Sequence, residues 1–240
     1  MKQSKLVGYV IGRRNLGDSD LIISVFSRDL GKCSFVAKGA KKPRAKLRAH
    51  LEPLAEIEFR TVGNSSLPTL VGVSPISTNN FFSAEYGLRL IALYVTEVLS
   101  QVSVESQPNQ ALYESYGRFL VQCLKTDKPL LLLNQALFEI MQSSGIEPRV
   151  EPVKAGQYFF DFDEGMITAK MPAHPSPEVS QDLVKFWKLI LNYDKATVMR
   201  LRLDRSVGLE SAGLINDYLE HHFNRQLKSF KVLKQSPDLF

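Results

Sequence analysis

The sequence predicts an α+β protein in which a small closed β-barrel is followed by a mostly α-helical region with one small β-hairpin. Two observations carry this prediction. The first 75 residues contain five short runs rich in Val, Ile, Phe and Thr, and turn residues separate these runs. Beyond residue 85, most apolar residues recur at helical spacing instead. With 240 residues, 44% of them hydrophobic, the chain has enough apolar mass to form such cores.

The barrel prediction depends on the spacing and alternation of the five runs. In AEIEF, Ile57 and Phe59 alternate with Glu56 and Glu58, as in a strand with one buried face. Five strands within about 75 residues fit an OB-fold, a barrel that leaves no open sheet edge and often holds single-stranded nucleic acid. The predicted strands are residues 6–14, 21–27, 32–39, 54–62 and 67–75.

The region after the barrel is predicted to be helical with one hairpin. Pro129 is expected to begin one helix and Gly145 to end it, and Ser176 is the expected N-cap of another. The segment 157–170 alternates around Asp163-Glu164-Gly165, which predicts a hairpin whose aromatic residues pack in the core. The predicted helices span about 85–102, 111–125, 129–145, 176–191 and 206–225.

A segment rich in Pro, Ser, Thr and Asn, residues 74–83, separates strands from helices and is interpreted as a linker. We therefore predict two domains. Residues 1–78 would form the OB-fold domain and residues 79–240 the helical domain.

Positive charge is concentrated in the barrel segment. Residues 1–80 hold 13 Lys and Arg against six Asp and Glu, whereas the remainder of the chain is slightly acidic, although the whole chain carries +5. Local charge of this kind indicates a segment that meets a polyanion.

The densest basic stretch is AKGAKKPRAKLR, residues 37–48, which no acid interrupts. It follows a predicted strand, and Gly39 and Pro43 flank its central lysines and would fix its shape. Cations distributed in this way could contact phosphates along a groove. A solvated surface loop or a localisation signal would also be basic. The candidate DNA-binding residues are Lys38, Lys41, Lys42, Arg44, Lys46 and Arg48, with Arg13 and Arg14 as further candidates.

The sequence offers little for catalysis or metal binding. It has no phosphate-binding GxxxxGK loop, no HExxH and no GxSxG. Adjacent His221 and His222 would point about 100° apart on a helix, so they are poor partners for one metal ion. The acids at the hairpin tip, Asp161, Asp163 and Glu164, could bind a divalent cation but are better explained as a solvated turn. We expect no catalytic residue, no metal and no cofactor. Cys33 and Cys123 lack a CxxC pattern and are expected to be buried thiols.

Three segments of the first 76 residues form a recognisable set: RRNLGDSDLIISVFSRDLGK (13–32), FVAKGAKKPRAKLRAHLEP (35–53) and LPTLVGVSPI (67–76). In this order they resemble the RecO family of bacterial DNA repair and recombination mediators. The resemblance continues through the helices to RLDRSVGLESAGLINDYLEHHFNRQLKS (202–229).

The resemblance implies an N-terminal OB-fold, a helical C-terminal domain and a function without turnover. RecO-like proteins bind single- and double-stranded DNA and anneal complementary strands. With RecR, and sometimes RecF, they help RecA replace the single-stranded-DNA-binding protein SSB, whose C-terminal tail they contact. Carried over by position, the basic stretch 37–48 would be the DNA-facing loop.

Two departures from the family pattern stand out. Many members carry a four-cysteine zinc module, but the matching region here, about residues 145–174, contains no cysteine. Many also have Arg-Arg-Phe-Glu on the preceding helix, where this chain has Asn134-Gln135-Ala136-Leu137. If those arginines hold the acidic SSB tail, other cations such as Arg118 or Lys125 would have to replace them.

Three other functions remain open from the sequence. The chain could be a protein-interaction adaptor whose helical domain binds a partner and whose basic loop only assists. It could be an RNA-binding OB protein, or a metal-dependent nuclease using the acids of the hairpin. The N-terminal apolar run 6–11 is too short for the core of a signal peptide, so we expect a cytoplasmic protein.

Overall fold

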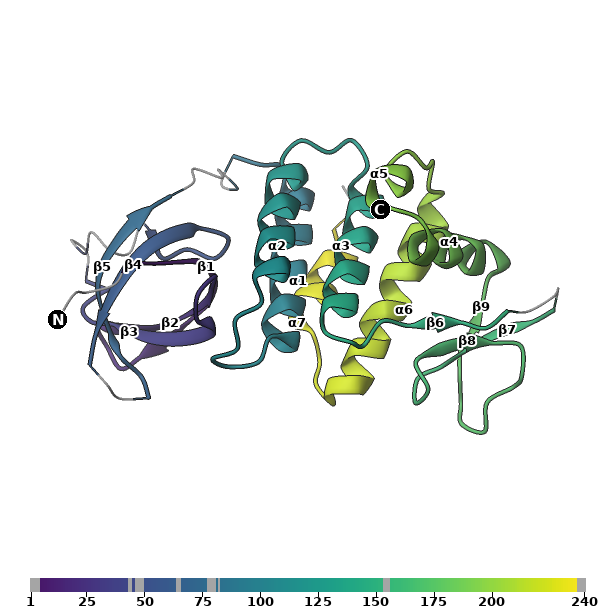
Figure 1. Cartoon of the computed structure of the whole chain (residues 1–240), viewed down its shortest axis with the longest axis horizontal. Helices are drawn as coiled ribbons and strands as arrows, with labels where there is room; N and C mark the ends of the chain where they lie inside the picture. Colours follow the sequence, from purple (N-terminus) through teal and green to yellow (C-terminus); the bar gives the residue numbers. More distant parts are fainter. Residues whose placement is uncertain are drawn as a thin grey trace. The chain divides into compact units, whose positions relative to one another are not determined.

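The computed structural model describes residues 5–42, 45, 50–63, 66–76, 81, 83–152 and 156–236. Within these ranges five strands form a closed barrel (Figure 1). They are β1 (Leu6–Leu16), β2 (Asp20–Ser27), β3 (Gly31–Ala37), β4 (Glu56–Val62) and β5 (Thr69–Pro75). The predicted barrel and its five strands are thus confirmed.

The strand order of the barrel is β1-β2-β3-β5-β4, and β4 pairs back onto β1. All pairs are antiparallel except β3 with β5, which is parallel. Alternate residues point inwards, so that Leu21, Ile23 and Val25 of β2 join Phe35 and Phe59 in one apolar core. This is the OB-like barrel that the spacing of the five apolar runs in the sequence predicts.

Two helices, α1 (Tyr86–Val102) and α2 (Gln110–Cys123), belong to the same compact unit as the barrel, residues 1–125. Tyr9 of β1 packs on Tyr113 and Tyr116 of α2, with ring centroids 4.9 and 5.1 Å apart. The Tyr113 hydroxyl donates a hydrogen bond of 2.9 Å to the carboxylate of Glu56 on β4. Burial raises the pKa of both Tyr9 and Tyr113, so this contact between helix and barrel stays uncharged on the tyrosine side.

The second compact unit, residues 126–240, contains five helices and a four-stranded sheet of order β6-β8-β7-β9 within its described ranges. The helices are α3 (Pro129–Ser143), α4 (Gln181–Asn192), α5 (Lys195–Val198), α6 (Arg205–Phe223) and α7 (Lys228–Lys234). The strands are β6 (Arg149–Val150), β7 (Tyr158–Asp161), β8 (Met166–Thr168) and β9 (Glu178–Val179).

The core of the second unit forms around Trp187 of α4. Its side chain is fully buried, its ring meets Phe138 and Phe160 edge-on, and its indole N–H donates to the Ser211 hydroxyl at 2.8 Å. Phe160 also packs on Tyr218 of α6. The hairpin aromatics Tyr158 and Phe160 are therefore core residues, as predicted.

One predicted helix start is wrong. The helix expected from Ser176-Pro177 begins at Gln181, and its N-cap is Ser180, whose hydroxyl accepts a hydrogen bond from the Leu183 amide at 3.1 Å. The residues before it are extended because they serve the sheet: the Pro177 carbonyl accepts from the Phe160 amide at 3.0 Å, and Val179 pairs with Tyr158.

Other helix ends agree with the sequence. Pro129 is the first residue of α3, and Gly145 follows its last turn with a φ of +69°. The change from strands to helices falls where predicted, but the division between compact units falls after Lys125. The boundary at residue 78 stays a prediction.

Candidate nucleic-acid interface

The basic stretch begins where β3 ends, and both of its flanks are fixed in the barrel. Ala40 and Leu51 are fully buried members of the barrel core. The basic stretch is therefore held by barrel-core residues at position 40, near its start, and at position 51, just after its end. Of the predicted DNA-binding residues in the basic stretch 37–48, Lys38, Lys41 and Lys42 are described. Arg44, Lys46 and Arg48 lie outside the described residues.

A carboxylate that the sequence analysis did not single out anchors the start of this segment. Asp20, at the beginning of β2, accepts a 2.7 Å hydrogen bond from the Gly39 amide and a 3.0 Å hydrogen bond from the Ser19 hydroxyl. The Gly39 hydrogen bond, followed by that of Ser19, holds the pKa of Asp20 below its ordinary value, and Lys38 and Lys42 add to the effect. Asp20 is therefore ionised at neutral pH, and its charge faces the basic segment.

Lys41 fastens the segment to the turn between β1 and β2. Its amide donates to the Ser19 carbonyl at 2.9 Å, and its ammonium donates to the Gly17 carbonyl at 3.1 Å. In OB-folds the β1–β2 turn is one of the loops that bind oligonucleotides. The described start of the basic segment, at Lys41, consequently lies beside a loop that OB-folds use for oligonucleotides.

The described cations at this end of the barrel include Lys38, Lys42 and Arg14. All three side chains are exposed, and none has a hydrogen bond or ion pair with another described residue. Arg13 differs, because its guanidinium is paired with Glu52, just after the basic segment. Arg13 thus ties β1 to the far flank of that segment, and its guanidinium already has an anionic partner.

The outer face of β2 and β3 is partly closed to ligands. Lys32 donates a 2.7 Å hydrogen bond to the Ser100 carbonyl at the end of α1. Phe26 packs on Tyr113 of α2, with ring centroids 6.1 Å apart. These contacts cover the end of the two strands away from the β1–β2 turn. Lys32 is therefore a structural cation, whereas Lys38, Lys42 and Arg14 lie at the opposite end of the strands.

The acids of the hairpin tip, the candidate residues for binding a divalent cation, are engaged in other interactions. At the hairpin tip the Asp161 carboxylate accepts from the amides of Asp163 and Glu164, Asp163 lies 2.9 Å from His221 Nε2, and Glu164 pairs with Arg149. Within the ranges that the structure covers, no three His, Cys, Asp or Glu side chains are grouped so as to hold a metal ion.

The two thiols lie apart from this surface. Cys123 is buried and Cys33 half-buried, and both are unbridged. Burial raises the pKa of each thiol to about 12, so neither is a thiolate at neutral pH.

Comparison with known proteins decides the family. The model for the N-terminal domain of recombination protein O matches residues 1–79, and the model for its C-terminal domain matches residues 87–231. The chain belongs to the RecO family. Barrel and helical region thus correspond to the two RecO domains, and the family supports a role in DNA repair and recombination.

Two named relatives match nearly the whole chain, and a third matches just over half of it. The DNA repair protein RecO of Syntrophus aciditrophicus is 25% identical over 248 residues, which cover 96% of this chain and 95% of the relative. That of Pelotomaculum thermopropionicum is 25% identical and covers 97% and 94%. The RecO protein of Vibrio parahaemolyticus is 30% identical over 138 residues, covering 57% and 56%.

The departure at Asn134-Gln135 has a structural basis. Asn134 is fully buried in α3, and its amide group donates to the carbonyls of Leu130 and Gly208, at 2.8 and 3.0 Å. Gln135 is buried as well and donates to Glu139. In this RecO protein Asn134 joins α3 to α6 inside the second unit, which a charged arginine could not do without losing its hydration, whereas Gln135 makes its hydrogen bond within α3.

None of the helices within the described ranges combines the length and hydropathy that spanning a bilayer requires.

Removing the anchor of the basic segment gives the first prediction. Asp20→Ala deletes the acceptor of the Gly39 amide, so the Gly39 amide proton should exchange with solvent several-fold faster than in the wild type. Because the folded pKa of Asp20 is depressed, the anchor is present above the ordinary Asp pKa of about 3.9 and is lost as the pH falls through the folded pKa. Amide exchange measured by NMR checks both effects. Unchanged exchange at Gly39 would mean that Asp20 does not hold the segment.

Proposed function

We propose that this RecO protein is a non-enzymatic mediator of recombinational repair. It would bind single- and double-stranded DNA, anneal complementary strands and, with RecR and in some settings RecF, help load RecA onto SSB-coated DNA in the cytoplasm. One observation supports the proposal: on an OB-like barrel, the described start of the basic segment is fastened to the β1–β2 turn by Lys41, and core residues Ala40 and Leu51 hold it near its start and just after its end. Its DNA-binding residues would be Lys38, Lys41, Lys42, Arg44, Lys46 and Arg48, with Arg14 and Arg13.

The proposed chemistry is electrostatic. Two DNA strands repel each other through their phosphates, and a basic surface that neutralises both raises their local concentration. Exposed lysines make contacts that do not depend on the base, so the strands can search for register while bound. In this proposal Lys38, Lys42 and Arg14 contact phosphate directly, whereas Lys41 and Asp20 mainly hold the segment in place.

An annealing assay tests the proposal. Two complementary oligonucleotides, each carrying one dye of a fluorescence transfer pair, should pair faster with the protein than without it. The same strands, incubated with protein and Mg²⁺ and separated on a denaturing gel, should remain full length. No acceleration would argue against a mediator and favour an adaptor, whereas fragments would argue for a nuclease. Competition by RNA of the same sequence, if stronger than by DNA, would favour an RNA-binding protein.

A groove in the second unit has the charge that the acidic SSB tail needs. It has a volume of about 380 Å³ beside the first turns of α3 and α6. Leucines line it, and Lys128, Arg202 and Arg205 outnumber the single acid Asp127. Arg202 and Arg205 are exposed, and no described residue pairs with either side chain. Free guanidinium groups over an apolar floor suit a peptide that carries both carboxylates and apolar side chains.

We predict that Arg202→Glu with Arg205→Glu weakens binding of a synthetic SSB-tail peptide about tenfold or more, because it replaces two attractive charges by repulsive ones. Affinity for single-stranded DNA should change less than about twofold. Fluorescence anisotropy measures both ligands. Arg118→Glu with Lys125→Glu is the matched comparison: if that pair abolishes peptide binding while Arg202→Glu/Arg205→Glu does not, the tail binds elsewhere.

A further inference from the structure

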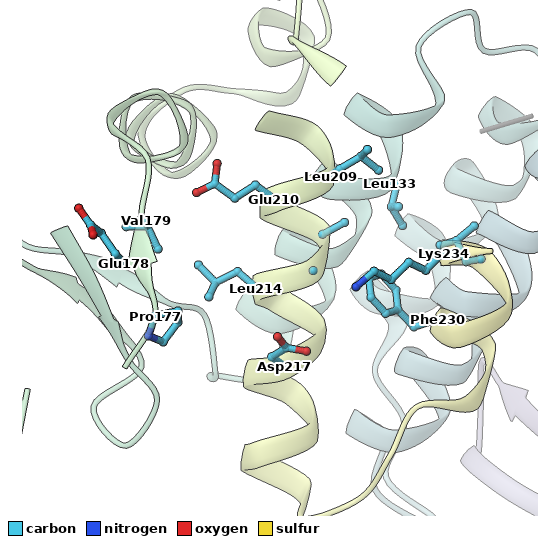
Figure 2. Close-up of a pocket in the computed structure, with 13 residues that line it drawn as sticks. Leu133, Pro177, Glu178, Val179, Leu209, Glu210, Leu214, Asp217, Phe230 and Lys234 are labelled. Carbon is cyan, nitrogen blue, oxygen red and sulfur yellow. The ribbon is translucent and has the colours of Figure 1, made fainter. Parts of the chain in front are cut away.

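A second groove crosses the exposed face of α6 in the C-terminal unit (Figure 2). It has a volume of about 480 Å³ and lies between β9 on one side of α6 and α7 on the other. Its lining is mostly apolar. The apolar lining residues include Leu133, Val179, Leu209, Ala212, Gly213, Leu214 and Phe230.

The floor of this groove is low because two small residues, Ala212 and Gly213, lie at its centre. A Cβ added to Gly213 would meet no atom within 4 Å, so the space above this position is open. Leu209 and Asp217 lie four residues to either side of Gly213 and therefore share its helix face. A floor of small residues between raised walls is the shape into which the apolar face of a helix docks.

The rim of the groove is acidic. Its charged lining residues are three acids, Glu178, Glu210 and Asp217, and one cation, Lys234 (Figure 2). Glu210 is fixed in place, because its carboxylate accepts hydrogen bonds from the Ser180 amide at 2.8 Å and from the Ser180 hydroxyl at 2.6 Å. Glu178 and Asp217 are exposed. The charge of this rim is opposite to that of the groove beside α3 and α6 and of the basic segment on the barrel.

We propose that the α6 groove binds an amphipathic helix of a partner protein, with an apolar face flanked by lysine or arginine. The leucines, Val179 and Phe230 would bury the apolar side chains of the helix, while Glu178, Glu210 and Asp217 would face its cations. An acidic peptide or a nucleic acid would meet repulsion from the three carboxylates. The proposal goes beyond the proposed function, since it adds a binding site that touches neither DNA nor the acidic tail of SSB.

The test uses a defined probe, a fluorescein-labelled 14-residue peptide in which leucines and lysines alternate at helical spacing. A second peptide has glutamate in place of every lysine. The lysine peptide should bind the full-length protein, and the glutamate peptide should bind at least tenfold more weakly. Gly213→Trp fills the open space and should weaken binding of the lysine peptide at least tenfold. Glu178→Lys with Asp217→Lys should do the same by reversing the rim charge.

Gly213→Ala is the matched control, because it adds one methyl group to open space and favours the helix. It should leave peptide affinity within about twofold of the wild type. An unchanged far-UV circular dichroism spectrum would show that the variants are folded. An unchanged affinity for single-stranded DNA would show that the loss of peptide binding at the α6 groove does not affect the proposed DNA-binding surface.

Three results would overturn the proposal. Equal binding of the two peptides would remove the role of the acidic rim. Unchanged affinity in Gly213→Trp would place the peptide elsewhere. A dimer of the wild type that Gly213→Trp dissociates, measured by sedimentation velocity, would make a second copy of this chain the occupant.

Discussion

Reversing the charge of Lys38 and Lys42 is expected to weaken binding of single-stranded DNA about 25-fold or more at 0.1 M salt. Each phosphate contact on a single strand contributes a slope of about −0.7 in log K against log salt, which corresponds to about fivefold in affinity at 0.1 M. Lys38→Glu with Lys42→Glu removes two such contacts and adds repulsion. Both side chains are exposed and make no hydrogen bond or ion pair with a described residue, so the main internal interaction that changes is their attraction to Asp20.

The control for this variant is Lys170→Glu with Lys231→Glu, which changes the net charge equally at two exposed lysines of the C-terminal unit. If affinity depends only on net charge, the two variants will bind DNA equally weakly, and the basic segment loses its special role. Protection of the Gly39 amide from exchange in Lys38→Glu/Lys42→Glu shows whether the segment keeps its position.

Gly31→Ala is expected to destabilise the N-terminal unit by about 2–5 kcal/mol. Gly31 has a φ of +70°, which costs a residue with a side chain about 1–2 kcal/mol. A Cβ at Gly31 would also lie 2.1 Å from the Gln107 carbonyl oxygen, in the connection between α1 and α2. Moving this backbone adds the cost of overpacking, about 1–3 kcal/mol. Equilibrium urea unfolding, monitored by circular dichroism, measures the sum.

Gly17→Ala separates the two causes. Gly17 has a similar φ of +58°, but nothing lies within 4 Å of an added Cβ. It should therefore lose only the backbone contribution, about 1–2 kcal/mol. Equal losses for the two variants would contradict a close approach between the β2–β3 turn and the α1–α2 connection.

The barrel could be predicted from the sequence because its signals are local. Each strand can be recognised within its own short stretch of sequence. Apolar residues alternate with polar ones, as at Ile57 and Phe59, and turns end the strands at Gly17, Gly31 and Gly63. The two-residue strands β6 and β9 and the seven-residue helix α7 are too short to show a period, and they exist because neighbouring segments bind them. Ser176 failed as an N-cap for the same reason: the sheet, and not local propensity, holds Pro177 extended.

The candidate site was only partly predictable. Runs of lysine and arginine mark a basic segment in any sequence, but the anchor is a tertiary contact between Asp20 and Gly39, which lie 19 residues apart. An Asp in the turn sequence LGDSD was a weak signal for it. The sequence could not distinguish cations that have an internal partner from cations that are accessible to DNA. Only the fold shows that Lys32 bonds to Ser100 and that Arg13 pairs with Glu52.

The salt dependence of single-stranded DNA binding tests the central claim most directly. Fluorescence anisotropy of a labelled oligo-dT should be titrated between 50 and 300 mM NaCl for the wild type and Lys38→Glu/Lys42→Glu. Two lost phosphate contacts predict that the slope of log K against log salt becomes shallower by about 1.4. A slope that the substitutions leave unchanged would show that DNA binds elsewhere and would contradict the assignment of the basic segment as the DNA-binding surface.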